Sequence, residues 1–337
     1  MTPPPWRKLG NSGPSVFPLA LGCMGMSGVY GPCEEAESIA TIHAALDQGV
    51  TLLDTGDFYG MGHNELLINR ALKGRRHQAL LSVKFGALRA PDGNWVGFDA
   101  RPAAVKNFLA HSLTRLGVDH VDIYRPARLD PSVPIEETLG AIAELVKAGY
   151  VRGVGLSEVG ADTVARAQKV HPIADLQIEY SLLSRGPESE IFPRLWELGI
   201  GVTAYGVLSR GLLSGSKVAP KGDSRTRFPR FAADNRQRNE ALVQALQKAA
   251  ADKGCTPTQL AIAWVLAKDL RIVPTVGART RQQLTEMLGA LEVRLSAQEV
   301  AHLESSVPAS GVAGTRYDAH QMGVLDSEKP AAAARSA

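Results

Sequence analysis

The chain of 337 residues has little cysteine and no long apolar run, and both shortages narrow what it can be. Its three cysteines are odd in number and show no CxxC spacing, which disfavours a disulfide framework and a structural zinc site. The N-terminus, MTPPPWRKLG, has no apolar region of the kind found in secretory signals, and no apolar run approaches the length that spans a bilayer. These absences predict a cytoplasmic protein with no membrane partner.

Motifs of several enzyme classes are also missing. The eight histidines form neither HxH nor HExxH, and no GxSxG or reactive-cysteine motif occurs, so we expect no metal and no hydrolase site. GxGxxG is absent after the first expected strand, and GVGLSEVG has the wrong spacing for a Rossmann site. The net charge is only +3, and apart from Arg225, Arg227 and Arg230 the basic residues are dispersed. A local anion such as a phosphate is therefore a better expected partner than nucleic acid.

The chain does contain short apolar runs that alternate with stretches of helical period. Val105, Leu109 and Leu116 belong to one apolar stripe, and CTPTQLAIAWVLA predicts a helix with Thr256 as N-cap and Gln259 as its capping-box partner. Eight strand–helix units without a Gly/Pro/Ser-rich linker predict one domain, a closed (β/α)8 TIM barrel over residues 1–326. The expected strands are residues 19–22, 51–54, 80–84, 121–124, 153–156, 175–178, 201–205 and 272–276.

Three segments fall outside the barrel pattern. WRKLGNSGPSVF predicts an N-terminal hairpin with a turn at Gly13-Pro14. Residues 206–235 are too long for a plain connection after strand seven and predict a functional lid. The biased sequence SEKPAAAARSA predicts a flexible tail over residues 327–337.

Chemistry is expected where the barrel strands end, because active sites of such barrels form at the carboxyl ends of the strands. Strand two runs into LLDTGDFYGMGHNE and strand three into SVKFG, which brings Asp54, Tyr59 and Lys84 to one rim. A lysine ammonium favours the phenolate and makes a tyrosine a better proton donor, and a carboxylate keeps that lysine charged. One such residue alone is more often a cap or a surface salt bridge. Three complementary ones suit protonation of an oxygen while a carbonyl is reduced.

The motifs LGCMGMSG, LLDTGDFYG, SVKFG, GVGLSEV, LQIEYSLLSR, TAYGVLSRGLLSG, PRFAADNRQRN and VPTVGARTRQQLTE follow one another along the chain. From Arg7 to Tyr317 the chain thereby resembles the aldo-keto reductases, and most closely their bacterial and fungal branch related to the potassium-channel β subunits. The resemblance implies a barrel that binds NADPH without a Rossmann fold and reduces small aldehydes or ketones. Asp54, Tyr59 and Lys84 match the first three members of that family's Asp-Tyr-Lys-His catalytic tetrad.

The resemblance also assigns cofactor contacts. Ser157 and Gln177 would hold the nicotinamide carboxamide, and Tyr205 would lie beside the ring, with a tyrosine simply packed at the rim as the alternative. Arg279 precedes a helix, and because a helix N-terminus with an added guanidinium suits a phosphate, it would meet the 2′-phosphate of NADPH. The other cofactor residues implied are Gly22, Met24, Asp54, Gly206, Ser209, Arg210, Leu212, Gly277, Gln283 and Glu286.

Some positions depart from the family pattern or leave two interpretations open. Met287 stands where the family commonly has Asn, which removes one expected adenine contact, and Gly206 lacks the hydroxyl of the usual Ser-Pro-Leu. Residues 217–230 would fold over the cofactor as a clasp, or their arginines would form a solvated face. Cys23 and Met24 are expected as pocket walls rather than reactive groups.

The fourth strand end contains the largest departure. Where the family reads Gln-His-Arg-x-Asp-Pro, this chain has PARLDP, so Ala127 occupies the place of the catalytic histidine. Losing such a donor can cost about 2.7–4 kcal/mol where it is used. Alanine would leave room for a bulkier ketone, or Arg125 on the same strand face would supply a donor. The alternative for Arg125, and the preferred one for Arg128, is an ion pair with a nearby acid, Asp122 or Asp130. The expected substrate pocket comprises Ala127, Arg125, Met26 and Tyr59.

Two functions of different classes remain open at this point. One is an NADPH-dependent reductase of an aldehyde or ketone with Tyr59 as proton donor. The other is an NADP(H)-binding redox sensor or regulatory subunit with slow turnover, which the loss of histidine at Ala127 favours. The loop at 277–286 disfavours a barrel isomerase or lyase without a redox cofactor. Neither the carbonyl substrate nor the choice between a monomer and a homo-oligomer follows from the sequence.

Overall fold

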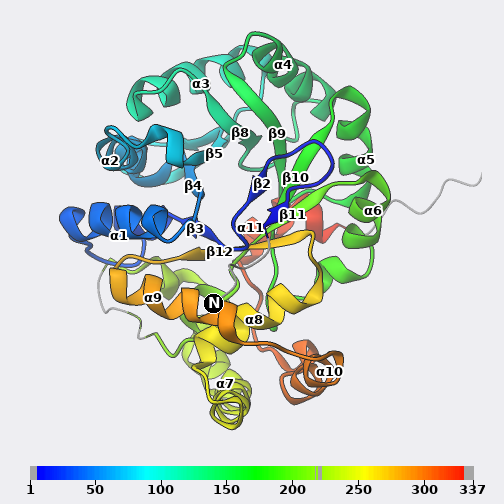
Figure 1. The fold of residues 1–337 in the computed structure, drawn as a ribbon. Coiled ribbons are helices and arrows are strands. Elements are labelled where there is room, and N and C mark those ends of the chain that lie inside the picture. Colours follow the sequence, from blue (N-terminus) through cyan, green and yellow to red (C-terminus); the bar gives the residue numbers. More distant parts are fainter. Residues whose placement is uncertain (1–5, 217, 219–221, 330–337) are drawn as a thin grey trace, which may run out of the picture.

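The structure is a computed structural model, and it describes residues 6–216, 218 and 222–329. Eight parallel strands close into a barrel in the order β3-β4-β5-β8-β9-β10-β11-β12, surrounded by helices (Figure 1). The predicted (β/α)8 barrel is confirmed, and every strand overlaps its predicted range. The strands are β3 (Ala20–Gly22), β4 (Leu52–Gly56), β5 (Leu80–Phe85), β8 (Val121–Pro126), β9 (Val151–Ser157), β10 (Ile173–Glu179), β11 (Gly201–Tyr205) and β12 (Ile272–Gly277).

The helices cover the barrel with the apolar faces that the sequence periodicity predicts. Val105, Leu109 and Leu116 of one helix are buried against the strands. Another helix begins with the predicted capping box. The Thr256 side chain accepts from the Gln259 backbone N–H, and the Gln259 side chain accepts from the Thr256 backbone N–H. The helices are α1 (Glu35–Asp47), α2 (His63–Ala71), α3 (Pro102–Leu116), α4 (Ile135–Lys147), α5 (Ala161–Val170), α6 (Ile191–Leu198), α7 (Ala233–Lys253), α8 (Pro257–Lys268), α9 (Arg281–Gly289), α10 (Ala297–Ser306) and α11 (Ala319–Val324).

The N-terminal hairpin closes one end of the barrel. Strands β1 (Arg7–Lys8) and β2 (Ser15–Val16) pair antiparallel around the predicted turn, and they lie across the barrel in Figure 1. Leu9 and Val16 pack on the apolar side chains of four barrel strands, and the Arg7 guanidinium donates to the carbonyl groups of Leu266, Asp269 and Ile272. A site that admits ligands must therefore form at the opposite end.

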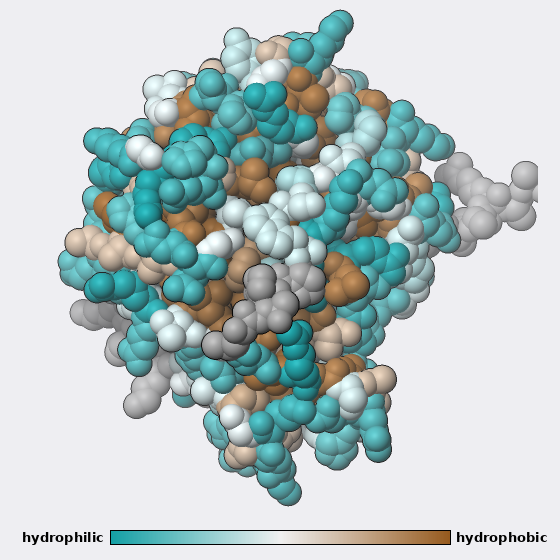
Figure 2. Space-filling view, viewed as in Figure 1, coloured by the Kyte–Doolittle hydropathy of each residue, from teal (hydrophilic) through white to brown (hydrophobic). Residues whose placement is uncertain are grey.

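The outer surface and the C-terminal segment complete the fold. The face in Figure 2 is mostly hydrophilic, with apolar residues scattered over it, and within residues 6–329 as described no helix has the length and apolarity to cross a membrane. Ser327 lies in the 3₁₀ turn Asp326–Glu328, and its hydroxyl donates to Glu158 Oε2 over 2.6 Å. The predicted flexible tail is therefore wrong for residues 327–329, which are held on the barrel. Residues 330–337 lie outside the described residues.

A buried ion pair crosses the barrel interior. The Arg125 guanidinium binds both carboxylate oxygens of Asp175 at 2.9 and 3.1 Å, and both side chains are fully buried. Arg125 also donates to the Ser82 hydroxyl at 3.0 Å. The sequence-based alternatives for Arg125, a substrate contact or an ion pair with Asp122 or Asp130, are wrong. The Arg125 side chain points into the barrel, where its acidic partner, Asp175, comes from β10 and not from residues near Arg125 in the sequence.

We expect Asp175→Asn to destabilise the protein by about 3–5 kcal/mol, because it leaves the Arg125 charge buried without its partner. Urea unfolding followed by circular dichroism measures the change. The double variant Arg125→Met/Asp175→Leu should recover most of the loss, since it removes both buried charges. A single variant as stable as the parent would show that water or other groups solvate Arg125.

Candidate active site

Asp54, Lys84 and Tyr59 come together at the carboxyl ends of β4 and β5, as predicted. Lys84 Nζ donates to Asp54 Oδ1 over 2.6 Å, and only 5% and 8% of these side chains are exposed. The second oxygen of Asp54 accepts from Gln177 Nε2 at 2.7 Å and from Ser82 Oγ at 3.2 Å. Lys84 Nζ lies 5.1 Å from the centroid of the Tyr59 ring. The carboxylate is thus fully hydrogen-bonded, and it holds the ammonium group beside the phenol.

Burial controls the protonation of this group of residues. It raises the pKa of Tyr59 well above the ordinary value, Asp54 adds to the rise, and Arg128 opposes it. Burial likewise lowers the pKa of Lys84, against the stabilising effect of Asp54. The predicted lowering of the Tyr59 pKa is therefore wrong, because burial and the Asp54 carboxylate raise it. Tyr59 keeps its proton at neutral pH and can donate it.

The ends of β9 and β10 supply an unsatisfied polar group next to Asp54. Ser157 and Gln177 are paired in register on these strands, and Gln177 reaches Asp54. The Ser157 hydroxyl is buried and has no hydrogen-bond partner among the described residues. Since buried polar groups are nearly always paired, an orphaned hydroxyl here fits the polar edge of a bound molecule. The carboxamide of a nicotinamide is such an edge.

Arg279 lies between the end of β12 and the start of α9. Its backbone N–H donates to Gln283 Oε1 at 2.8 Å, and its guanidinium donates to the Tyr30 carbonyl at 3.2 Å. The methylene groups of Arg279 pack on Gly25, where an added Cβ would come within 3.2 Å of Cγ. This half-buried guanidinium has no carboxylate partner among the described residues, which leaves it able to bind an anion.

Some of the other predicted cofactor contacts around this rim are exposed, whereas others already have a hydrogen-bond partner or are buried in the core. Gly22 and Gly277 are paired in register on β3 and β12. Glu286 accepts a hydrogen bond from Thr256 Oγ1 at 3.0 Å, so its carboxylate already has a partner. Met287 is 1% exposed and packs in the core, which explains why an apolar residue stands at that position.

The short 3₁₀ helix after β3 carries the two methionines of the predicted site. It spans Met24–Ser27 and follows Cys23, which is buried and has a raised pKa because of burial. Met24 is half-buried, whereas Met26 is 2% exposed and belongs to the hydrophobic core. The assignment of Met26 to the substrate pocket is therefore wrong, since its side chain is enclosed by core residues.

The loop after β11 has an unusual backbone. Gly206 has φ +66°, and a Cβ there would lie 2.9 Å from Glu179 Cγ, which explains glycine where the family has serine. Ser209 and Arg210 also have positive φ, 47° and 55°, in the 3₁₀ turn Ser209–Gly211, and Leu212 that follows is buried. Such conformations are costly for residues with side chains and cluster at functional sites.

The following segment crosses toward the loop after β3. The Ser224 backbone N–H donates to the Val29 carbonyl at 3.1 Å, and Asp223 forms a β-bridge with Tyr30. Arg225 and Arg230 are only 3% and 8% exposed, so a solvated face is the wrong interpretation for these two arginines. Residues 217 and 219–221 of the predicted clasp lie outside the described residues.

Ala127 and Arg128 follow β8 directly. The Ala127 backbone N–H donates to the Phe85 carbonyl at 2.8 Å, and the residue is 2% exposed. Arg128 donates to the Ala127 carbonyl at 2.6 Å and to the hydroxyl of Tyr317 at 3.1 Å. The predicted ion pair of Arg128 with Asp122 or Asp130 is wrong, because the C-terminal segment brings Tyr317 within its reach.

Three residues at the mouth of the barrel escaped the sequence analysis: Glu158, Arg316 and Tyr317. Glu158 follows β9 with φ 53°, is fully buried, and accepts from Arg316 at 2.9 Å and from the Tyr205 hydroxyl at 2.7 Å. Burial alone would raise the pKa of Glu158, but Arg316, followed by Arg128 and the Ser327 hydroxyl, lowers it to about 2. Tyr317 lies with its hydroxyl 2.9 Å from that of Tyr205. The one signal available in the sequence was an acid immediately after Ser157 at a strand end.

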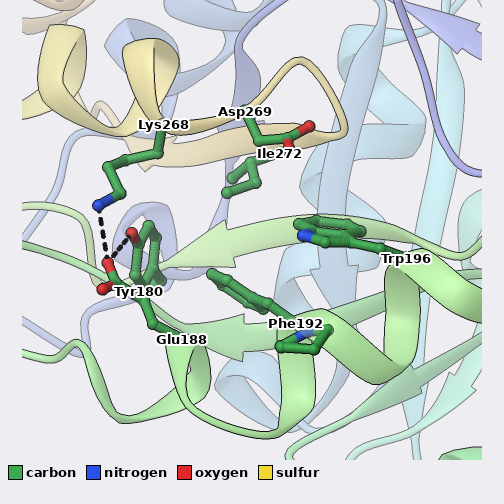
Figure 3. A pocket seen from close by; sticks show the side chains of 8 residues that line it. Tyr180, Glu188, Phe192, Trp196, Lys268, Asp269 and Ile272 are labelled. Atoms are coloured by element: carbon green, nitrogen blue, oxygen red, sulfur yellow. Dashed lines mark hydrogen bonds and ion pairs between the residues drawn. The ribbon is translucent and has the colours of Figure 1, made fainter. Parts of the chain in front are cut away.

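A separate pocket of about 240 Å³ lies on the outer wall, between α6 and the end of α8 (Figure 3). Phe192, Trp196 and Tyr180 line it, and its Glu188 carboxylate accepts from the Tyr180 hydroxyl and pairs with Lys268 at 3.1 Å. These polar groups satisfy one another. The pocket does not belong to the group formed by Asp54, Lys84 and Tyr59.

The structure is thus a closed (β/α)8 barrel with a buried lysine–carboxylate pair beside a tyrosine at its strand ends. The chain belongs to the aldo/keto reductase family, whose model matches residues 18–308. This family comprises oxidoreductases that use nicotinamide cofactors and act on small carbonyl compounds.

Individual relatives agree with this assignment. The chain is 40% identical over 317 residues to a probable aldo-keto reductase 1 of Glycine max, covering 92% of this chain and 91% of that protein. It superposes on the glycerol dehydrogenase AKR11B4 of Gluconobacter oxydans with a TM-score of 0.81 at 28% identity, over 91% and 96% of the two chains. The aldo-keto reductase AKR11C1 of Bacillus halodurans, in its holo form, gives 0.76 at 28% identity, over 94% and 99%.

Asp57, two residues before Tyr59, yields a prediction about pH. Burial, followed by the nearby Glu65 carboxylate, raises the pKa of Asp57 to about 7, and its Oδ1 has no partner among the described residues. An unfolded aspartate loses its proton near about pH 3.9, so the folded state binds more protons between that pH and neutrality. Folding stability should therefore fall as the pH rises through this range, then stay constant.

Asp57→Asn should remove this penalty. We expect little difference in Tm from the parent near pH 4 and a growing advantage of the variant up to neutral pH, measured by calorimetry. Asp252→Asn, at an exposed position of α7, is the matched control and should show no such trend. Parallel pH profiles for the parent and Asp57→Asn would contradict the assigned protonation of Asp57.

Proposed function

We propose that the protein is an NADPH-dependent reductase that converts an aldehyde or ketone to an alcohol. The observation that carries the proposal is the buried Lys84–Asp54 pair at 2.6 Å, with the lysine directed at the ring of a protonated Tyr59. NADPH, when bound, supplies the hydride. Tyr59 donates its hydroxyl proton to the carbonyl oxygen, Lys84 stabilises the phenolate that remains, and Asp54 keeps Lys84 charged and oriented.

Residues that would bind the cofactor lie around the same rim. Ser157, with its unpaired hydroxyl, and Gln177 would hold the carboxamide, and Tyr205 would lie beside the nicotinamide ring. Arg279, together with the N-terminus of α9, would bind the 2′-phosphate. The free state of all three cysteines supports the cytoplasm, a reducing compartment, as the place of action.

Ala127 adds two features to this proposal. No imidazole is present to hydrogen-bond the carbonyl oxygen, so Tyr59 would hold that oxygen, and the smaller side chain would leave volume for a bulky ketone. The same substitution is the observation that favours the second candidate, a redox sensor that binds NADP(H) and turns over slowly. Turnover against a broad panel of substrates separates the two.

Tyr59→Phe should reduce NADPH oxidation with a panel of aldehydes and ketones by at least about a hundredfold, because it removes the general acid. Its affinity for NADPH, measured by cofactor fluorescence, should match that of the parent, since the ring and the Asp54–Lys84 pair remain. A parent protein that binds NADPH but fails with the whole panel would support the sensor.

Arg279→Gln should weaken NADPH binding by about tenfold to a hundredfold and leave NADH binding nearly unchanged, because one charge-assisted contact to the 2′-phosphate is lost. Arg281→Gln is the matched control, since Arg281 lies two residues further on and pairs with Glu37 at 2.9 Å. An equal loss of affinity for both cofactors would contradict the assignment of Arg279.

A further inference from the structure

The mouth of the barrel carries more arginine than acid. Four guanidinium groups lie there, and among the described residues three carboxylates form ion pairs with them. Arg316 pairs with Glu158 and with a second glutamate at 2.5 and 2.8 Å, while two other arginines share Glu179 at 3.3 Å each. The cations are Arg128, Arg210, Arg230 and Arg316, and the anions are Glu158, Glu179 and Glu328.

Arg128 is the cation in this group without a carboxylate. Its hydrogen bonds go to two neutral acceptors, the Ala127 carbonyl and the Tyr317 hydroxyl, and no acid lies within ion-pair distance of it in the described part of the chain. Two of its five N–H donors are thus occupied, and both acceptors are weaker partners than a carboxylate. This half-buried charge is therefore able to form stronger hydrogen bonds with an anionic ligand than with its present partners.

The hydrogen-bond chain beyond Arg128 has one direction. Glu158 accepts the hydrogen bond of the Tyr205 hydroxyl, so the Tyr317 hydroxyl must donate to Tyr205 and accept from Arg128. Tyr317 therefore has no proton left for a ligand. The donors still available at this point belong to Arg128.

Arg128 also lies close to the reacting groups. Ala127 is hydrogen-bonded to Phe85, the residue after Lys84 on β5, so the start of the β8 loop is fixed beside the lysine strand. The charge of Arg128 lowers the pKa of Tyr59, against the larger effect of burial, and lowers the pKa of Lys84 in the same direction as burial does. A molecule bound to this guanidinium would therefore lie near Tyr59 and Lys84.

We propose that the substrate is an oxo acid, a carbonyl compound whose carboxylate binds the guanidinium of Arg128. This inference rests on the proposed reductase function and names its substrate class. The fork of N–H donors on arginine matches a carboxylate in shape and charge. Arg279, which we assign to the cofactor phosphate, is a different arginine at a different strand end. It follows β12, which neighbours β3 in the barrel, whereas Arg128 follows β8.

The reaction balances with the carboxylate unchanged. The carbonyl carbon gains a hydride from NADPH, the carbonyl oxygen gains the proton of Tyr59, and the products are a hydroxy acid and NADP⁺. Solvent returns the proton to Tyr59. Arg128 binds the carboxylate throughout and replaces the orienting role of the absent imidazole.

Binding of mandelate and of mandelamide to the protein loaded with NADP⁺ tests the inference by calorimetry, since the two molecules differ chiefly in the carboxylate charge. We expect mandelate to bind at least about tenfold more tightly, because hydrogen bonds to charged groups are worth that much. Arg128→Gln should abolish the preference and Arg128→Lys should restore part of it. Arg166→Gln, which removes an exposed arginine paired with Glu136, should keep it. Equal binding of the two ligands to the parent would overturn the inference.

Two further measurements separate other roles for Arg128. Tyr317→Phe removes the same hydrogen bond from the opposite side and should retain the preference for mandelate. An equal loss in both variants would mean that Arg128 only holds the C-terminal segment. If Arg128→Gln weakens NADP⁺ binding and leaves the mandelate preference intact, Arg128 serves the cofactor, and the inference is wrong.

Measurements of turnover test the oxo-acid inference separately from the proposed reductase function. The parent should reduce phenylglyoxylate with a higher kcat/KM than phenylglyoxamide, and Arg128→Gln should bring the two values together. Reduction of both without preference would overturn the oxo-acid inference and leave the reductase standing. Selective mandelate binding without reduction of either compound would support the carboxylate site and refute the reductase.

Discussion

The buried ion pair between Asp54 and Lys84 is the interaction on which the site depends. Charges removed from water are costly unless they are paired and fully hydrogen-bonded, and here the donors to Asp54 come from β5 and β10. Ser82 donates to Asp54 and accepts from Arg125, whose guanidinium binds Asp175 on the far side of the barrel. One polar network thus runs through the barrel interior. The position of Lys84 beside the phenol requires that the whole barrel be closed.

The C-terminal segment around Arg316 and Tyr317 forms part of the mouth of the barrel. Arg316 neutralises Glu158, a fully buried acid in a left-handed backbone conformation, and this pairing brings Tyr317 onto Tyr205 and Arg128. Without Arg316 the carboxylate at the end of β9 would be buried without compensation. The shape of the mouth is therefore decided by residues that follow the last barrel strand.

Ala127, which stands in the place of the family's histidine, removes a hydrogen-bond donor from the expected site. Ala127 lacks the neutral donor of an imidazole, whereas the arginine of the family pattern is kept as Arg128, a permanent cation whose hydrogen-bond acceptors are neutral. Burial raises the pKa of Tyr59 and lowers that of Lys84, and the Arg128 charge acts on both groups. A negatively charged ligand would offset this charge while leaving Tyr59 protonated.

The sequence by itself determined the barrel and its reacting rim, because strand and helix periods are local and the ends of parallel strands must meet at one edge. Asp54, Tyr59 and Lys84 could be placed there for that reason. The pairings of Arg125 with Asp175, 50 residues away, and of Arg128 with Tyr317, 189 residues away, had no local signal. Both depend on which side chains point inward once the barrel is closed and on where the C-terminal segment returns. Only the tertiary structure could decide them, because ion pairs and hydrogen bonds depend on distance in space.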